Sequence, residues 1–232
     1  MRAALGGTDS CNSRIAARFA KRPWARYCRA EMRDVVITRV ECSGPPKRKR
    51  NLEEQILALF PGLYRRLAPR TFRLSPRSRL RRALLRRTVV SGWAAWNRRD
   101  LKLMLVFYAR DVEWEFSPGQ QALGLGGTFS GHQGVVDGLA EWREVWDSWE
   151  LEPAYILDLG DRLLNLGFAH ARASGVPFKE EFVQLITVRE GLVAHEGPTG
   201  PMQWEEGLRR AGLDPTALAL PRQRRERQAT QS

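Results

Sequence analysis

The chain has 232 residues, 43% of them hydrophobic, which is enough for one globular domain with extensions or for two small domains. Its formal net charge of +12 would suit a nucleic acid or an anionic membrane, but residues 1–90 hold 23 Lys and Arg against 6 Asp and Glu, whereas residues 91–232 hold 15 against 20. Because the excess of basic residues is confined to a poorly patterned leader, we expect no specific nucleic-acid partner.

Cysteine usage and hydropathy exclude further classes of protein. The cysteines are Cys11, Cys28 and Cys42, with no CxxC pair and no histidine at ligand spacing, so neither a disulfide framework nor a zinc site is expected. No stretch approaches the roughly 18 apolar residues of a membrane helix, and we therefore expect a cytoplasmic protein with no membrane partner. The arginine-rich residues 2–29 leave an organellar transit peptide open as an alternative.

The N-terminal third divides into two segments. Residues 1–50 lack a sustained period and end in a Gly-Pro-Pro turn and a charge run, which predicts a basic, disordered leader. The strand-like residues 35–38 within it are too isolated to assign to a sheet. Residues 51–78 are predicted to be a short helical extension. Apolar residues recur there at helical spacing and Pro61 interrupts them, so we expect either a short helix or a helix pair.

A regular pattern begins at Arg79. Apolar residues at helical spacing predict two amphipathic helices, the first closed by Asn97 and the second capped by Asp100. Alternation over residues 112–116 predicts a half-buried strand, and residues 119–127 form a glycine-rich loop.

A third helix and a run of strands are predicted next. The helix carries apolar residues every three or four positions, which we interpret as core: Val135, Leu139, Trp142, Trp146 and Trp149. Four strands separated by short turns imply an antiparallel meander, at residues 150–157, 162–172, 180–188 and 192–196. Residues 202–211 are predicted to form a closing helix, and a loose polar tail is expected over residues 215–232.

Five phrases stand out in this region: AAWNRRDL at 94–101, YARDVEW at 108–114, FSGHQGV at 129–135, EP with LDLGDR at 152–162, and VREGLV at 188–193. Together they resemble the SnoaL-like branch of the nuclear transport factor 2 superfamily and place one domain at residues 79–214. The resemblance implies an α+β fold, in which helices pack on a strongly curved antiparallel sheet and form a cone with an internal pocket. This superfamily includes isomerases, dehydratases, epoxide hydrolases, polyketide cyclases and non-catalytic modules, so the fold does not choose a chemistry.

The catalytic positions of the steroid isomerases in this superfamily can be compared one at a time. Their proton-shuttling aspartate falls on Phe116, their oxyanion-hole tyrosine near Gly92, and their hydrogen-bonding acid near Gln184. Phe116 can neither take nor give a proton, so the sequence does not support that mechanism.

His170 is the first catalytic candidate. Alternation on the strand 162–172 puts it on one face with Leu164, Leu166 and Phe168, and the resemblance turns that face toward the pocket. An imidazole there is a candidate general base. The alternative is a hydrogen-bonded histidine at the pocket rim with no catalytic part.

Glu196 is the second catalytic candidate. It falls where related sequences have an apolar residue lining the cavity, so a carboxyl group with a raised pKa is conceivable. The alternative is that Glu196 points to solvent where the strand ends at Gly197. The resemblance also implies a continued strand after this point, from which residues 197–201 depart.

We therefore expect a SnoaL-like domain that binds a hydrophobic small molecule in an apolar pocket. One interpretation is that it acts as a proton-transfer isomerase, cyclase or hydrolase on a polyketide- or steroid-like ligand. Neither a metal nor another cofactor is expected, because no metal-ligand spacing and no phosphate-binding loop is present. The alternative is a non-catalytic dimerisation or protein-interaction module, and the resemblance implies a homodimer. The predicted pocket lining is Trp93, Phe116, Leu139, Trp142, Phe168 and Gln184.

Overall fold

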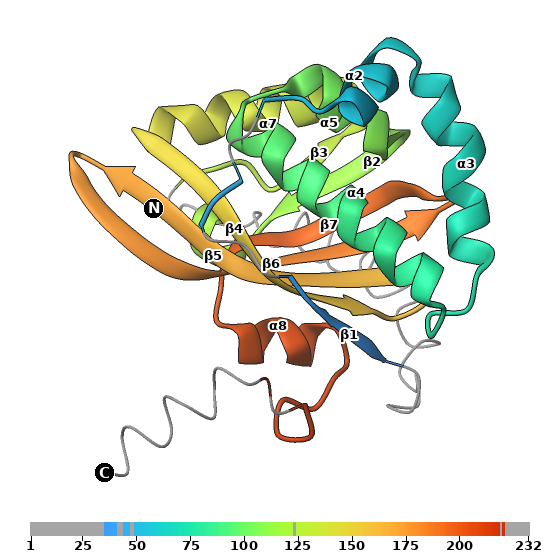
Figure 1. The fold of residues 1–232 in the computed structure, drawn as a ribbon. Helices are drawn as coiled ribbons and strands as arrows, with labels where there is room; N and C mark the ends of the chain where they lie inside the picture. The colour runs from blue at the N-terminus through green and yellow to red at the C-terminus, as the bar shows by residue number, and fades with distance from the viewer. Residues whose placement is uncertain (1–34, 41–43, 47–48, 123, 219, 221–232) are drawn as a thin grey trace, which may run out of the picture. The chain divides into compact units, whose positions relative to one another are not determined.

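A computed structural model describes residues 35–40, 44–46, 49–122, 124–218 and 220, all within the compact unit Met32–Ser232. No helix in these ranges is long and apolar enough to cross a bilayer. The elements in chain order (Figure 1) are β1 Val36–Arg39, α2 Leu52–Leu59, α3 Pro61–Arg73, α4 Arg79–Asn97, α5 Leu101–Phe107, β2 Tyr108–Phe116, α6 Pro118–Gln121, β3 Thr128–Ser130, α7 Gly131–Val145, β4 Ser148–Asp158, β5 Arg162–Ala173, β6 Val176–Arg189, β7 Leu192–Pro201 and α8 Trp204–Arg210.

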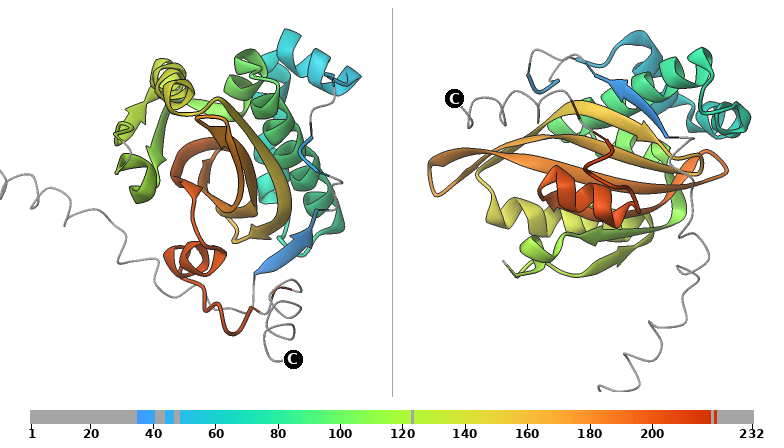
Figure 2. Two further views of the ribbon diagram at one scale, coloured as in Figure 1. Left: turned by 90° about the vertical axis from the view of Figure 1, so that its left-hand side faces the viewer. Right: turned by 90° about the horizontal axis from the view of Figure 1, so that it is seen from below.

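The seven strands of the described chain form one sheet in the order β1-β4-β5-β6-β7-β2-β3. Every neighbouring pair is antiparallel except β2 and β7, which run parallel. Strands β4 to β7 follow one another in space as in sequence, which confirms the predicted meander. Seen along its strands in Figure 2, the sheet curls without closing. Helices on a curled, mostly antiparallel sheet confirm the α+β cone.

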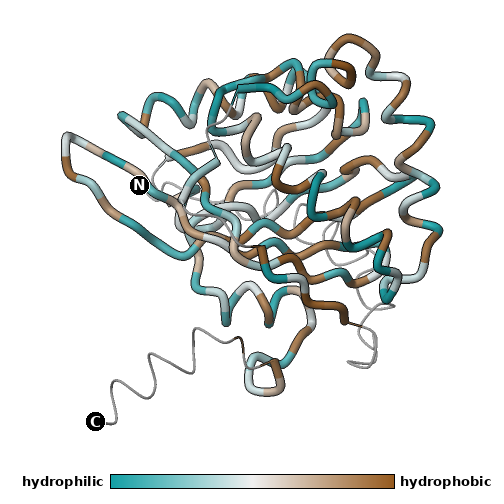
Figure 3. The backbone as a smooth tube through the Cα atoms, in the orientation of Figure 1, coloured by the Kyte–Doolittle hydropathy of each residue, from teal (hydrophilic) through white to brown (hydrophobic). Residues whose placement is uncertain are grey.

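Both faces of the sheet are buried, by different helices. One face packs against α4, α5 and α7, and we call it the inner face. The other, which we call the outer face, packs against α8 through Trp204 and Leu208. In Figure 1, α4 and α8 lie on opposite sides of the sheet. Because helices cover both faces, the central strands carry hydrophobic residues with little clean alternation (Figure 3).

Strand β5 shows the consequence for sequence interpretation. Its inner face carries Leu163 and Asn165, whereas Leu164, Leu166 and Phe168 lie on the outer face with α8. The expectation that the face of Phe168 and His170 looks into the pocket is therefore wrong. Alternation separates the two faces correctly but cannot say which is which, and a shift of one residue exchanges them completely. The more apolar face is the one that α8 covers.

Strand β1 corrects a second expectation. Residues 36–39 pair antiparallel with the edge strand β4, and the Val40 N–H donates to the Ala154 carbonyl at 2.8 Å. The stretch is thus part of the sheet rather than an isolated strand-like run. Four residues are too few to show a period, and their partner lies far along the chain. Residues 1–34 of the predicted leader, the three cysteines and residues 221–232 of the predicted tail lie outside the described residues.

Helices α2 and α3 fall within the predicted extension 51–78. Asn51 and Glu54 form a capping box at the start of α2, and Pro61 occupies the first position of α3, where its missing N–H costs no hydrogen bond. Helix α3 lies against the turn between β6 and β7. A Cβ atom at Gly191 would come within 2.4 Å of the Ala68 backbone, so a glycine is needed for this approach.

Helix α7 is shorter than its aromatic stripe suggests. It ends at Val145, so Trp146 is its C-cap and Trp149 belongs to β4. Trp142 and Trp149 are nonetheless buried together, with ring centroids 4.6 Å apart, whereas Trp146 is only half-buried. The interpretation of the stripe as core holds for the residues up to Trp142 and for Trp149.

Arg81 is buried, although its position in the helical pattern suggested a polar face. Its guanidinium makes a bidentate pair with the Asp158 carboxylate of β4, with both N–O distances 2.7 Å. The remaining N–H groups donate to the carbonyl oxygens of Phe72, Leu74 and Gly160. All five donors are therefore satisfied, which is the condition under which a charge can be buried at low cost.

We predict that Arg81→Met lowers the free energy of unfolding by about 3–5 kcal/mol, because it leaves the buried Asp158 carboxylate without its partner. Arg189→Met is the matched control, since Arg189 pairs with Asp111 on the surface and its loss should leave the unfolding midpoint nearly unchanged. Urea denaturation of both variants measures the difference. Equal decreases in the free energy of unfolding of the two variants would show that the buried Arg81 pair contributes no more to stability than the surface pair.

Candidate functional site

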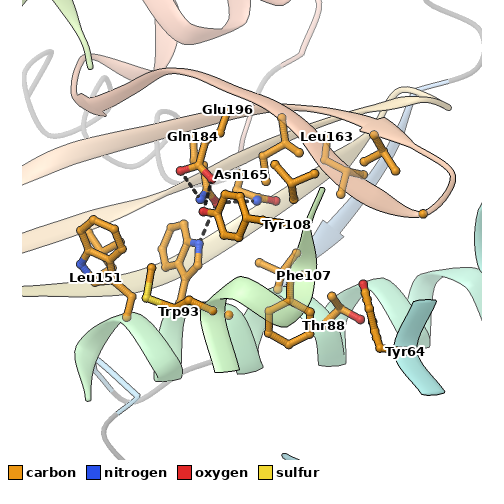
Figure 4. A pocket seen from close by; sticks show the side chains of 18 of the residues that line it. Tyr64, Thr88, Trp93, Phe107, Tyr108, Leu151, Leu163, Asn165, Gln184 and Glu196 are labelled. Atoms are coloured by element: carbon orange, nitrogen blue, oxygen red, sulfur yellow. Dashed lines mark hydrogen bonds between the residues drawn. The ribbon is translucent and has the colours of Figure 1, made fainter. Parts of the chain in front are cut away.

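An apolar cavity of about 80 Å³ lies between the inner face of the sheet and helices α3, α4 and α5 (Figure 4). Most of its walls are aromatic or aliphatic, and the side chains include Tyr64, Trp93, Met104, Phe107, Leu163 and Ile186. Four polar side chains converge on one part of the wall: Tyr108, Asn165, Gln184 and Glu196. An apolar cavity with a few convergent polar groups is the usual form of a small-molecule site.

The polar residues form one hydrogen-bonded chain that ends at the Glu196 carboxylate. Gln184 Nε2 donates to Glu196 Oε1 at 2.8 Å, and the Tyr108 hydroxyl donates to Glu196 Oε2. The Gln184 amide oxygen accepts from Trp93 Nε1 at 2.9 Å and from Asn165 Nδ2 at 2.8 Å. Gln184 and Tyr108 each donate to one carboxylate oxygen, and Trp93 and Asn165 hold the Gln184 amide in the orientation that this requires.

Glu196 is 1% exposed and is the only charged side chain among those that line the cavity. Burial raises the pKa of its carboxyl group, because water no longer stabilises the charged form. The donors Gln184 and Tyr108 oppose this shift, as do the nearby Thr199 hydroxyl and Trp114 indole N–H, although neither of these last two completes a hydrogen bond of good geometry. The balance leaves the pKa above the ordinary glutamate value, closer to neutral pH.

The two tyrosines of the cavity stay protonated. Burial raises the pKa of Tyr108 well above its usual value, and the neighbouring Glu196 carboxylate raises it further. Burial also raises the pKa of Tyr64 to about 12, against a smaller opposing effect of the Thr88 side chain. At neutral pH Tyr108 is therefore a hydrogen-bond donor to Glu196 and not a base.

The backbone around Glu196 explains how a carboxyl group reaches this position. Strand β7 continues through Pro201, which corrects the expectation that residues 197–201 depart from a continued strand. Its pairing is irregular on both sides of Glu196, with register shifts against β6 and β2. A Cβ atom at Gly197 would lie 2.6 Å from the Glu115 Cβ, so glycine allows β7 to approach β2. Irregular pairing of this kind often redirects a side chain next to a functional site.

The site residues predicted from the sequence lie in several different parts of the structure. Glu196, Trp93 and Gln184 line the cavity. Leu139 and Trp142 line a separate cleft beside α7. Phe116 is fully buried, with its ring centroid 4.8 Å from that of Trp114, and Phe168 packs on Trp204 at the outer face.

His170 lies on the outer face and does not line the cavity. Its Nε2 atom is 2.6 Å from Glu152 Oε2, and Lys179 Nζ donates to the same oxygen at 3.0 Å. Partial burial would raise the pKa of the Glu152 carboxyl, but the hydrogen bonds from Lys179 and His170 outweigh it and hold that pKa below its usual value. His170 and Glu196 are thus not parts of one site.

Sequence reasoning missed Tyr108 and Asn165. Tyr108 shares the apolar side of the predicted second helix, whereas in the structure it is the first residue of β2. Asn165 is the one polar residue within the apolar run of β5 from Leu163 to Phe168. A polar residue in such a run could have been recognised from the sequence as a candidate site residue. Its Oδ1 atom is buried without a hydrogen-bond partner in the described chain. No group of three His, Cys, Asp or Glu side chains in the same ranges could hold a metal ion.

Comparison with known proteins agrees with this architecture. Residues 89–196 match the family of the SnoaL-like domain, and this range contains the second half of α4, the elements from α5 to β6, and the first half of β7 with Glu196. The chain therefore carries a SnoaL-like domain of the nuclear transport factor 2 superfamily, as the sequence predicted. Helices α2 and α3 and strand β1 precede the matched range. No curated protein sequence matches the chain at a significant level.

Several solved structures are similar to this chain over about half of its length. TerC co-crystallised with polyporic acid is 29% identical, with 47% of this chain and 85% of TerC covered and a TM-score of 0.45. An NTF2-like protein of unknown function from Burkholderia pseudomallei K96243 is 27% identical, with 53% and 93% covered and a TM-score of 0.47. An NTF2-like protein from Burkholderia xenovorans LB400 is 30% identical, with 47% and 83% covered and a TM-score of 0.36.

The raised pKa of Glu196 predicts how stability depends on pH. Between the ordinary glutamate pKa of 4.5 and the higher value in the folded protein, the folded state keeps a proton that the unfolded chain releases. The free energy of unfolding should therefore fall as pH rises through this window, and Glu196→Gln should remove that part of the fall. Urea titrations of both proteins from pH 4 to pH 8 measure it. Parallel stability curves would mean that Glu196 titrates normally.

Proposed function

We propose that the domain binds a small hydrophobic molecule in the cavity and moves a proton on it through Glu196. The observation that supports this most directly is a carboxyl group buried in an apolar cavity, with a raised pKa and with fixed hydrogen-bond donors but no cation beside it. A carboxyl group whose pKa approaches the working pH can both accept and return a proton.

The chemistry best suited to this arrangement is proton abstraction from carbon next to a carbonyl group. The ionised carboxylate takes the proton, the C–H electrons move into the enolate of the ligand, and the neutral acid then returns the proton to the same carbon or to a conjugated one. Gln184 and Tyr108 hold the two carboxyl oxygens, so little reorganisation is needed during the transfer. The net result is an isomerisation, or the first step of a cyclisation.

Asn165 adds information about the ligand. Its buried Oδ1 atom accepts no hydrogen bond from the described residues, and an acceptor left unsatisfied in an apolar site costs about 1–3 kcal/mol. A hydroxyl group on the bound molecule, or a bound water molecule, would satisfy it. We therefore propose a hydroxylated, largely apolar ligand, consistent with a polyketide- or steroid-like class.

Deuterium exchange into a ketone tests the proposal. The probe is 2-tetralone in D2O, followed by proton NMR after its buffer-catalysed exchange is subtracted. Wild-type protein should accelerate exchange, and Glu196→Gln should lower the catalysed rate by about 100-fold or more, the usual contribution of a general base. Glu144→Gln is the matched control, because Glu144 is an exposed acid on α7. Equal rates in both variants would remove Glu196 from the chemistry.

Tyr108→Phe should shift the pH dependence of the same exchange. The hydroxyl of Tyr108 favours the charged form of Glu196, so its loss should raise the pKa of that carboxyl further. Because the ionised form is the base, the rising limb of the rate profile should move to higher pH. If the rate profile of Tyr108→Phe between pH 5 and pH 9 is the same as that of the wild-type protein, Tyr108 does not influence the pKa of the catalytic carboxyl group.

The alternative function is a non-catalytic dimerisation or interaction module, in which the cavity has no substrate. The exposed end of the β5–β6 hairpin offers a surface for it, where Lys179 and the 64% exposed Val176 lie. A homodimer remains a proposal that light scattering can test. Binding of 2-tetralone without exchange would support a binding module, and absence of both would support the interaction module.

A further inference from the structure

A second hollow adjoins the cavity, and we call it the tryptophan cleft. It has a volume of about 40 Å³ and lies where the junction of α4 and α5 meets the end of α7 and the start of β4. Its walls include the indoles of Trp96, Trp142, Trp146 and Trp149. Trp96 and Met104 line both the cleft and the cavity, so these two side chains form the partition between them.

Three indole N–H groups at this cleft lack acceptors. The Nε1 atoms of Trp142, Trp146 and Trp149 are buried, and none has a hydrogen-bond partner in the described part of the chain. A buried donor without an acceptor is unfavourable and uncommon in folded proteins, so three in one place call for an explanation. A bound molecule that carries acceptor oxygens would supply one.

The charges of the cleft have a single sign. Arg99 and Arg143 are the charged residues that line it, and both are exposed. Neither makes an ion pair with a described residue. Guanidinium groups bind carboxylates through paired N–H donors and also stack on aromatic rings. Aromatic walls, free donors and two cations are together complementary to a flat ring that bears a negative charge.

We propose that the tryptophan cleft binds a planar aromatic carboxylate, with the ring among the indoles and the carboxylate at Arg99 and Arg143. Because the cleft and the cavity share Trp96 and Met104 in their walls, the proposal extends to one molecule that has its ring in the cleft and its reactive carbon at Glu196. This last step rests on the proposed function, whereas binding in the cleft does not. The substrate is then an elongated acid with a ketone at its buried end.

The first test measures binding of 2-naphthoate, with neutral 2-naphthamide as the charge control. Arg99→Gly and Arg143→Gln should each weaken naphthoate binding at least fivefold in calorimetry and leave naphthamide binding unchanged. Arg99 has a left-handed backbone with φ of 59°, which glycine adopts with less strain, so Arg99→Gly removes the charge without loss of the fold. Unchanged naphthoate affinity in both variants would overturn the proposal.

Indole N–H resonances locate the bound probe. Naphthoate should shift those of Trp142, Trp146 or Trp149, each assigned by a Trp→Phe variant. The Trp93 indole, which donates to Gln184 in the cavity, serves as the reporter for the other site and should move little. A shift confined to Trp93 would place the probe in the cavity and refute the cleft. Glu196→Gln should leave naphthoate binding intact, so a failure of the proposed catalysis would not be mistaken for a failure of the cleft.

The second test asks whether one molecule spans both hollows. The exchange assay is repeated with a 2-tetralone that carries a carboxylate on its aromatic ring. The carboxylate should lower KM relative to 2-tetralone, and Arg99→Gly should raise KM for the acid alone while kcat stays similar for both. Equal KM values for the two ketones in wild-type protein would show that the ring and the reactive carbon do not occupy the two hollows together.

Discussion

The buried ion pair of Arg81 and Asp158 is the constraint on which the cavity depends. One guanidinium joins the start of α4, the end of the α3 segment at Phe72 and Leu74, and the turn after β4. These are the parts that place α3 over the cavity and hold α4 against the inner face. The pair is buried at low cost because every donor has an acceptor, and its strict geometry fixes the three segments relative to one another.

Glu196 is a second buried carboxyl group, but its hydrogen-bond partners are neutral, whereas Asp158 is paired with a guanidinium. Among the described residues no arginine or lysine lines its cavity, and neutral donors take the place of a cation. A cation beside it would favour the ionised carboxylate and would leave it a poor base at neutral pH. Neutral donors fix its position without fixing its charge. The same fold thus contains one carboxylate used for structure and one whose protonation can change.

Local patterns predicted most of the fold, because amphipathic helices, the meander and its glycine turns each have short-range signals. The face of β5 could not be predicted, since Leu164, Leu166 and Phe168 are core residues under α8 and alternation alone cannot tell one covered face from the other. Glu196 was identified through the resemblance, and its partner Tyr108 was missed because its role depends on a helix that ends one residue earlier. Contacts such as that of Arg81 with Asp158 join distant segments and leave no local trace.

Gly191 controls how closed the cavity is. The backbone of α3 approaches this turn so closely that a single methyl group would overlap with Ala68, and α3 carries Tyr64 and Phe72, which form part of the cavity wall. The position of this wall of the cavity therefore depends on the missing side chain of one turn residue. Variation at that residue would change how large a molecule can enter, while the hydrogen bonds around Glu196 remained as they are.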